Sequence, residues 1–237
     1  MQKRGKSMNR VVKDYETREE EILTSAQQLF FTKGYDKTSV SEIIKANDIA
    51  KGTFYHYFDS KLDLLLAVTD RMVEQGLVPI KEMMQDESLS GKEKFEQIFQ
   101  ISSSWKTDNV ESLKALLSVL YQDENALLRE KINEKNIEKI TPIWGQAVRE
   151  AVEDGDFDTR YPEETGRLIL QMGTSFSKDT AFLILQIEDD DTNIDKIKYR
   201  FKAYEDAIER VLGADPGSLN IIDKTLIDTL ENFVAEE

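Results

Sequence analysis

The sequence predicts an all-α protein in two parts, three short helices near the N-terminus and a larger helical region after them. Apolar residues recur at spacings of three and four along most of the chain, which is the helical period. No segment combines strand-like alternation with a second strand to pair with. The two parts also differ in charge: residues 1–84 hold 13 Lys and Arg against 13 Asp and Glu, and the remainder holds 18 against 33. All of the net charge of −15 therefore lies after residue 84.

The composition excludes several classes of function. The 237 residues include no cysteine and one histidine, which excludes disulfides, thiolate catalysis and Cys- or His-rich metal sites. The longest apolar runs, at 64–68 and 181–187, are far shorter than a membrane span. No apolar stretch follows the basic N-terminal residues, as a secretory signal requires. We therefore expect a soluble cytoplasmic protein that needs no cofactor or metal and contacts no membrane.

The first helix is predicted from about residue 17 to residue 33. Thr17 is a cap-like residue, and residues 19–21 are glutamates in the first turn, where the helix dipole favours negative charge. Gly34 ends the run. The inward face carries apolar residues at spacings of three and four: Ile22, Ala26, Leu29 and Phe30.

Residues 37–58 predict two short helices separated by a tight turn. Thr38 or Ser39 caps the first of them, and Glu42 completes a capping box with Ser39. Asn47 and Asp48 tolerate left-handed backbone angles and form the turn. The inner faces are then Val40, Ile43 and Ile44 in the first helix and Ala50, Phe54 and Phe58 in the second.

The segment TFYHYF at 53–58 is also rich in residues that favour strands. As a strand it would bury His56 between Phe54 and Phe58, and no neighbouring segment predicts a second strand to pair with it. The helix is therefore favoured. In a helix, six residues of this region remain for a partner: Lys51, Gly52, Thr53, Tyr55, His56 and Tyr57.

Three helices with a tight turn between the second and the third predict a helix-turn-helix unit, whose last helix lies in the major groove of DNA. Gly52 lets the start of that helix approach DNA closely, where its amides favour phosphate or base-edge acceptors. Tyrosine hydroxyls donate well to phosphate, and Thr38 and Ser39 offer the same contact at an upstream helix start. His56 has no nucleophile or carboxylate placed around it in the sequence, so DNA contact is favoured over catalysis.

The run TSVSEIIKANDIAKGTFYHYFDSKLDLL at 38–65 resembles the DNA-binding domain of TetR-family transcriptional regulators, with its K-G-T-hydrophobic-Y-x-Y/H-F-x-S/N-K-x-x-L pattern. The preceding run ILTSAQQLFFTKGYDKTSV at 22–40 resembles the first helix of that family, and together they cover under a quarter of the chain. The resemblance implies base contacts by four residues: Lys51, Gly52, Thr53 and His56. It implies contacts to the DNA backbone by five: Thr38, Ser39, Tyr55, Tyr57 and Lys61.

Two positions in the turn depart from the pattern of the family. Asp48 stands where the family often has Gly, and Ala50 stands where it often has a Ser or Thr cap. Asp adopts turn conformations at small cost. We therefore expect an altered turn and not a lost one.

After residue 60 only helical periodicity is visible. A long helix at 60–84 contains Gly76 and Pro79, which we expect to bend it or to end it early. Further helices are predicted at 91–106, 110–122, 125–153 with an interruption near Pro142, 162–187, 194–212 and 218–235, with loops at 153–162 and 188–193.

These elements predict three parts: a flexible basic arm at 1–14, a helix-turn-helix DNA-binding domain at 15–61, and a helical effector-binding and dimerisation domain at 62–237. The arm is either an unstructured tail or a contact to the minor groove or the phosphates, and the sequence leaves both open. Its first 13 residues include no acidic side chain and five basic ones: Lys3, Arg4, Lys6, Arg10 and Lys13.

The resemblance also implies a homodimer that binds palindromic half-sites of an operator and responds to a small-molecule effector of unknown identity. The helices at 162–187 and 194–212 are expected to form an intersubunit four-helix bundle. A ligand cavity in the second domain is suggested by the family. As candidates for its lining we take five aromatic residues: Phe99, Trp105, Tyr121, Trp144 and Phe176.

Two patterns that resemble enzyme or metal sites do not predict one. Ser-x-x-Lys occurs at 103–106 and 175–178 without the companion motifs of serine acyltransferases. Residues 154–159 carry carboxylates at alternating positions, as a calcium-binding loop does, but the sequence lacks the glycine at loop position six and the acidic residue at position twelve. We therefore expect no catalytic residues. The prediction is a transcriptional regulator, a homodimeric repressor released from its operator by a small-molecule effector; the alternative is a helical protein-interaction module without DNA binding.

Overall fold

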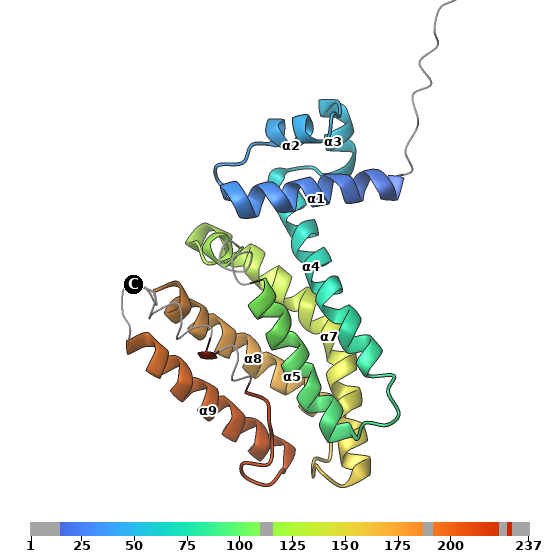
Figure 1. The fold of residues 1–237 in the computed structure, drawn as a ribbon, viewed down its shortest axis with the longest axis vertical. Helices are drawn as coiled ribbons and strands as arrows, with labels where there is room; N and C mark the ends of the chain where they lie inside the picture. The colour runs from blue at the N-terminus through green and yellow to red at the C-terminus, as the bar shows by residue number, and fades with distance from the viewer. Residues whose placement is uncertain (1–14, 110–115, 187–191, 223–226, 229–237) are drawn as a thin grey trace, which may run out of the picture. The chain divides into compact units, whose positions relative to one another are not determined.

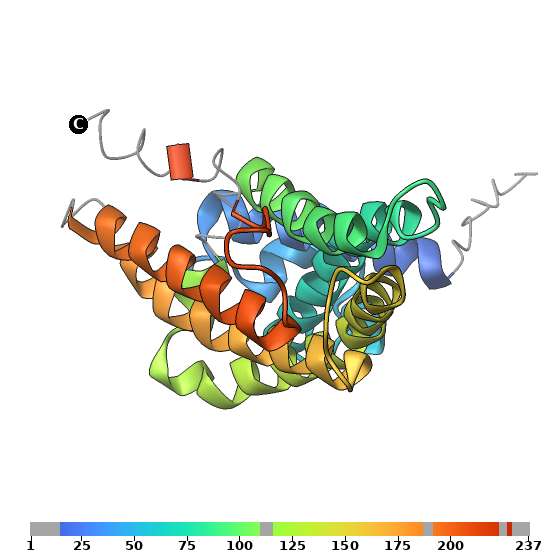
Figure 2. The ribbon, with the colours of Figure 1, turned by 90° about the horizontal axis from the view of Figure 1, so that it is seen from below.

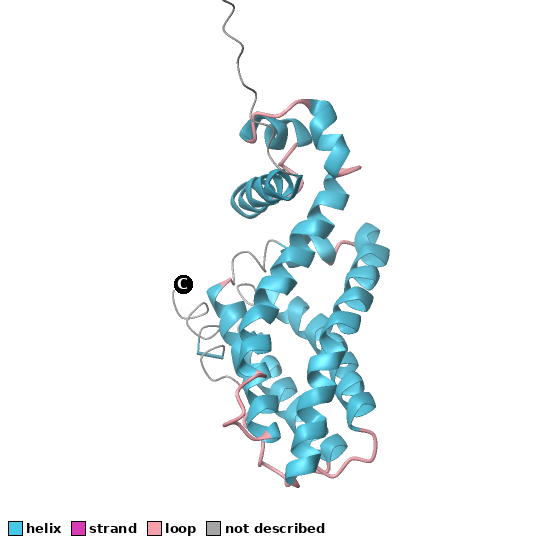
Figure 3. Ribbon diagram, turned by 90° about the vertical axis from the view of Figure 1, so that its right-hand side faces the viewer, coloured by secondary structure: helices cyan, strands magenta, loops and turns pink. Residues whose placement is uncertain are grey.

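The structure is a computed structural model of the chain, and it describes residues 15–109, 116–186, 192–222 and 227–228. All regular elements among these residues are helices, drawn in cyan in Figure 3, so the all-α prediction is confirmed. Contacts between residues divide the chain into two compact units, Met1–Thr69 and Asp70–Glu237. The predicted arm at 1–14 lies outside the described residues.

The first unit holds the predicted three helices and the beginning of a fourth: α1 (Tyr15–Lys33), α2 (Val40–Ala46), α3 (Lys51–Tyr57) and the first turns of α4 (Lys61–Met83). α2 packs against both α1 and α3 (Figure 1). α1 begins two residues before the predicted cap at Thr17 and ends before Gly34, whose φ of +92° carries no steric cost for glycine. The core is formed by apolar side chains of all four elements: Ile22, Ala26, Phe30, Ile43, Phe54, Phe58, Leu64 and Leu65.

The second unit contains the rest of α4 and five further elements: α5 (Gly91–Asp108), the 3-10 turn η1 (Asp123–Asn125), α7 (Ala126–Asp154), α8 (Pro162–Leu185) and α9 (Thr192–Leu212). α7 packs against α5 and α8, and α8 packs against α9, which lies beside it in Figure 2. Residues 116–120 are helical, within the predicted helix at 110–122, whose first six residues are not described. Among the described helices, none is both long and apolar enough to cross a bilayer.

Two helices continue past the residues expected to interrupt them. α4 does not end early at Gly76 or Pro79 but runs to Met83. The interruption predicted near Pro142 is wrong, because α7 runs through this proline. A proline inside a helix removes one backbone hydrogen bond, and packing of the flanking turns against the core offsets this loss. Buried or half-buried apolar residues lie on both sides of each proline: Leu77 and Ile80 in α4, Ile140 and Trp144 in α7.

The predicted start of the last helix is also wrong, because residues 218–222 are not helical. Glu209 is only 4% exposed, and its carboxylate accepts hydrogen bonds from the backbone amides of Gly217 (2.9 Å) and Leu219 (3.1 Å). The Glu209 side chain of α9 thereby holds the backbone of this segment in place. Leu219 and Ile221 enter the core instead. The rest of the predicted helix falls mostly outside the described residues.

Glycines allow α7 to pack closely against both of its neighbours. A Cβ on Gly91, at the start of α5, would lie 2.0 Å from the backbone nitrogen of Ala151 in α7. A Cβ on Gly166 in α8 would lie 2.8 Å from the backbone nitrogen of Gly145 in α7. A side chain at either position would collide with the backbone of α7. The close approach of α5 and of α8 to α7 therefore requires glycine at these two positions.

Candidate functional site

The two faces of α3 differ in burial. Phe54 and Phe58 are 0% and 3% exposed, and their ring centroids lie 6.1 Å apart. Ala50 was predicted to face inward with them, and this is wrong: it is exposed, because it is the N-cap and precedes the first helical turn. The opposite face presents the exposed residues Lys51, Gly52, Tyr55 and His56, with Thr53 and Tyr57 half-buried.

The exposed face of α3 continues into an aromatic cluster with the start of α1. The ring centroid of Tyr15 lies 4.4 Å from that of Tyr57 and 5.8 Å from that of His56. Tyr55 is 45% exposed, and the ammonium of Lys51 lies 5.8 Å from its ring centroid. Sequence reasoning missed the contact of Tyr15, because the first helix was predicted to begin after it.

The turn between α2 and α3 has the left-handed residue that the sequence predicts. Asp48 has a φ of +48°, a conformation that Asp tolerates better than most residues. The side-chain amide of Asn47 donates to the Ser25 hydroxyl in α1 and to the carbonyl oxygen of Ile43 (2.8 Å). The turn is thereby tied to α1, and this tie fixes where α3 begins.

Ser39 caps α2 and forms the predicted capping box. The Glu42 amide donates to the Ser39 hydroxyl (3.3 Å), and the Ser39 amide donates to the Glu42 carboxylate (2.8 Å). Hydrogen bonds from Lys33 and then from the Ser39 amide and hydroxyl lower the pKa of Glu42 to about 2. Ser39 is exposed, so a phosphate would compete with Glu42 for its hydroxyl.

Thr38 and Lys61 hold the first unit together in a way that the sequence did not predict. Thr38 is 1% exposed, and its hydroxyl donates to the carbonyl oxygen of Gly34 (2.8 Å). Lys61 Nζ donates to the carbonyl oxygens of Tyr35 (2.9 Å) and Thr38 (3.1 Å) and lies 4.1 Å from the Tyr35 ring centroid. The structure thus places Thr38 in the core and not on the surface expected to face DNA, and it leaves Lys61 one of its three N–H donors.

Gly52 has no role in the fold of the first unit. Its φ is not left-handed, and a Cβ built on it meets no atom within 4 Å. Glycine inside a helix costs about 0.5–1 kcal/mol relative to alanine, and neither packing nor backbone conformation explains its presence here. The open space above Gly52 is therefore available to a partner that approaches the helix backbone.

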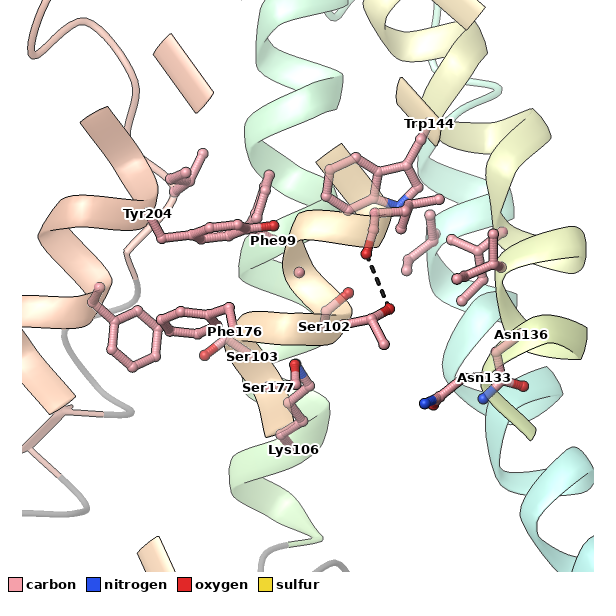
Figure 4. Close-up of a pocket in the computed structure, with 18 of the residues that line it drawn as sticks. Phe99, Ser102, Ser103, Lys106, Asn133, Asn136, Trp144, Phe176, Ser177 and Tyr204 are labelled. Atoms are coloured by element: carbon pink, nitrogen blue, oxygen red, sulfur yellow. Dashed lines mark hydrogen bonds between the residues drawn. The ribbon is translucent and has the colours of Figure 1, made fainter. Parts of the chain in front are cut away.

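The second unit contains a cavity of about 420 Å³, within the size range of small-molecule sites. Its walls come from α4, α5, α7, α8, α9 and the segment after α9 (Figure 4). Trp105, a predicted lining residue, does not line it: its indole lies 3.6 Å from the position of a Cβ on Gly76. The other four predicted residues do line it: Phe99, Tyr121, Trp144 and Phe176.

Aromatic rings form much of the cavity wall. The Tyr204 ring stacks on Phe176 with centroids 4.8 Å apart and an interplanar angle of 15°, and Phe99 meets Trp144 edge to face at 4.8 Å. The Tyr204 hydroxyl donates to the carbonyl oxygen of Ile169 (3.1 Å), and burial raises the pKa of this tyrosine. These contacts hold the rings in fixed orientations.

Sequence reasoning missed the polar residues of the cavity. Phe99 is followed on the same face of α5 by polar residues at spacings of three, four and seven, which is the helical period. This spacing could have identified the polar residues as cavity-lining, but the prediction considered only aromatic residues. The missed residues that line the cavity are Ser102, Ser103, Lys106, Asn133, Asn136 and Ser177.

Comparisons with known proteins agree with this fold. The family model of bacterial regulatory proteins, tetR family, matches residues 22–68, which form the helix-turn-helix part of the first unit. An uncharacterized HTH-type transcriptional regulator in the lacX 3' region of Lactococcus lactis subsp. lactis is 47% identical over 55 residues, 23% of this chain and 28% of its own length. This chain therefore aligns with less than a third of that relative.

Two longer similarities extend past the first unit. The uncharacterized HTH-type transcriptional regulator YxaF of Bacillus subtilis (strain 168) is 27% identical over 157 residues, 65% of this chain and 79% of its own length. The structure of Salmonella enterica GusR superposes with a TM-score of 0.55 over 86% of this chain and 99% of that chain, and at 17% identity it shows a shared fold alone. Residues 22–68 therefore carry the helix-turn-helix domain of the TetR family of transcriptional regulators.

Proposed function

We propose that this protein binds an operator in double-stranded DNA through α3 and represses transcription until a small molecule releases it. The observation that supports this most is the exposed face of α3, where Lys51, Tyr55 and His56 surround Gly52, a glycine that the fold does not need. Cationic and hydroxyl side chains bind phosphates and base edges, and an open helix backbone admits close approach. Residues 15–61 are then the DNA-binding domain.

The protein acts as a homodimer in this proposal, because α3 has only seven residues and covers a short stretch of the major groove. Two copies read half-sites about one helical turn apart, roughly 34–36 Å. Apolar side chains on the outer surfaces of α8 and α9 support a four-helix bundle between subunits: Leu168 is 44% exposed, Tyr199 76% and Val211 38%.

The effector site is the cavity of the second unit, within the proposed domain at 62–237. α4 begins at Lys61, which holds the α1–α2 loop, and it also supplies Leu77 and Ile80 to the cavity wall. A ligand that changes the position of these two residues acts on the same helix that anchors the DNA-binding domain. Such a ligand shifts the equilibrium only by as much as it prefers the state that does not bind DNA.

The proposal is tested by selecting DNA sequences from a random pool with the purified protein and then measuring the Kd of the selected duplex. Lys51→Ala and Tyr55→Ala are expected to weaken binding by about 1–3 kcal/mol each, about 5- to 150-fold in Kd. Lys131→Ala and Tyr161→Ala are the matched controls, because both residues are exposed in the second unit. The controls should bind as the unmodified protein does.

Salt dependence provides the second measurement. Loss of a phosphate contact reduces the slope of log K against log salt by about one unit, so Lys51→Ala should show a smaller slope or a relaxed base preference. If no sequence is selected, or if both α3 variants bind like the unmodified protein, the assignment of α3 as the DNA-reading helix is wrong.

A further inference from the structure

The cavity has a polar end on α5 whose hydrogen-bonding capacity is not used by the described residues. Ser103 is 8% exposed, and its hydroxyl has no hydrogen-bond partner within the described part of the protein. Lys106 follows one turn later on the same helix, and both residues line the cavity. Buried hydroxyls are nearly always hydrogen-bonded, so the unused donor and acceptor of Ser103 indicate a missing partner.

Lys106 is exposed, and it has no acidic partner among the described residues that line the cavity, whereas two other lysines of this unit are paired. Lys94 pairs with Glu150 at 2.7 Å, and Lys139 pairs with Asp70 at 2.6 Å. No Asp or Glu is among the described residues that line the cavity. Desolvation lowers the pKa of Lys106, with no opposing charge to raise it. An anion bound in the cavity would supply a counter-charge to Lys106 and a partner for the Ser103 hydroxyl.

The remainder of the cavity suits an apolar body. Figure 4 shows Phe99, Trp144, Phe176 and Tyr204 around one part of the space and Ser103, Lys106 and Ser177 around another. Aromatic walls with a few convergent polar groups are typical of sites for amphipathic small molecules. A single cation matches a single negative charge better than a phosphate dianion, because each unpaired charge in such a site is costly.

We propose that the cavity binds a small carboxylic acid, with the carboxylate at Ser103 and Lys106 and an aromatic or aliphatic body against Phe99, Trp144 and Tyr204. This inference rests on the proposed function, since it names the chemical class of the effector. The carboxylate accepts hydrogen bonds from the Ser103 hydroxyl and the Lys106 ammonium, and such charge-assisted bonds are the strong ones.

The same two residues form a Ser-x-x-Lys pattern, but their geometry does not provide a nucleophile. A catalytic serine needs a base within hydrogen-bond distance of its hydroxyl. The Ser103 hydroxyl makes no such bond to Lys106. The pair therefore recognises an anion and does not transfer an acyl group.

The test uses the full-length protein and isothermal titration calorimetry with matched neutral and anionic probes. Naphthaleneacetate and dodecanoate are each compared with the corresponding primary amide, which keeps the body and removes the charge. The acids should bind more tightly than the amides. Lys106→Met should weaken the binding of the acids about 10- to 100-fold and leave the amides unchanged, the loss expected for a hydrogen bond to a charged group. Ser103→Ala should weaken acid binding about 2- to 10-fold.

Lys92→Met is the matched control, because Lys92 lies on α5 and does not line the cavity. It should change neither the affinity for the acids nor the affinity for the amides. Lys106→Met should not lower the melting temperature, because Lys106 is exposed and makes no ion pair with the described residues, so a loss of binding by a folded variant is interpretable. Equal affinity for acids and amides, an unchanged acid affinity in Lys106→Met, or no binding of either acid overturns the inference.

A parallel measurement of DNA binding separates this inference from the proposed function. If the acids bind through Lys106 but the selected DNA is not released, the ligand class stands and the effector role fails. If the amides release DNA as well as the acids do, the effector role stands and the inference about the carboxylate fails.

Discussion

Replacement of Gly52 by alanine should stabilise the protein and weaken its binding to DNA. The two effects have separate causes. A Cβ at this position meets no protein atom within 4 Å, and the backbone is not left-handed. Alanine is favoured over glycine by about 0.5–1 kcal/mol in a helix interior, and this is the upper limit for Gly52, the second residue of α3. For a chain of this size that gain corresponds to a rise of about 1–4 °C in melting temperature.

The effect on DNA binding has the opposite sign. If the start of α3 packs against DNA, an added methyl group enters a filled contact, and overpacking of this kind costs about 1–3 kcal/mol. The Kd for the selected duplex should therefore rise about 5- to 150-fold. The assay is fluorescence anisotropy of labelled DNA, paired with thermal unfolding of the same preparation.

Gly76→Ala is the matched control for this experiment. A Cβ there lies at an ordinary contact distance, 3.6 Å from the Trp105 ring, in the interior of α4. It should raise stability by a similar amount without a direct clash with DNA. If Gly52→Ala binds DNA like the unmodified protein, the close approach of DNA to α3 is refuted; if it lowers stability, the open space above Gly52 is refuted.

Three further perturbations test other parts of the structure. Lys61→Met removes two hydrogen bonds to carbonyl oxygens of the α1–α2 loop and should lower the free energy of unfolding in urea by about 1–3 kcal/mol. Gly166→Ala places a methyl group 2.8 Å from the α7 backbone and should destabilise by about 1–3 kcal/mol, opposite in sign to Gly52→Ala. Hydrogen bonds from Lys33 and Ser39 lower the pKa of Glu42 from 4.5 to about 2, so its contribution to stability is complete above pH 4.5 and is lost as the pH falls toward 2. Glu42→Gln should flatten the stability profile in that window, measured by urea unfolding at several pH values, and an unchanged profile would contradict the role of the capping box.

Local signals in the sequence predicted the first unit well. Gly34 ends α1, Ser39 and Glu42 form the capping box, and Asp48 takes the left-handed turn position, because each of these features depends on residues within a few positions of one another. Long-range contacts were not predictable in the same way. The burial of Thr38 depends on α1 and on the loop after it, which accepts hydrogen bonds from Lys61 of α4. The periodicity of the sequence does not predict a hydrogen bond between residues so far apart.

The second unit shows the same division between local and distant causes. The helical spacing of the apolar residues predicted where the helices lie, but the continuity of α7 through Pro142 depends on packing against its neighbours. The irregular segment at 218–222 depends on Glu209, a residue of α9. The cavity was predicted by its aromatic residues alone, because a polar residue on a helix is ordinarily taken to face solvent. The polar end of the cavity could be identified only from the structure, in which residues of neighbouring helices line the same space.

The glycine contact between α7 and α8 fixes one wall of the cavity through the backbone itself. Gly145 and Gly166 leave no volume for these two helices to move closer, and Trp144 projects into the cavity from the same place. Ligands that share one end but differ in bulk would therefore keep the same pose against Trp144. Their difference in size would have to be accommodated by the walls that α7 and α8 do not form.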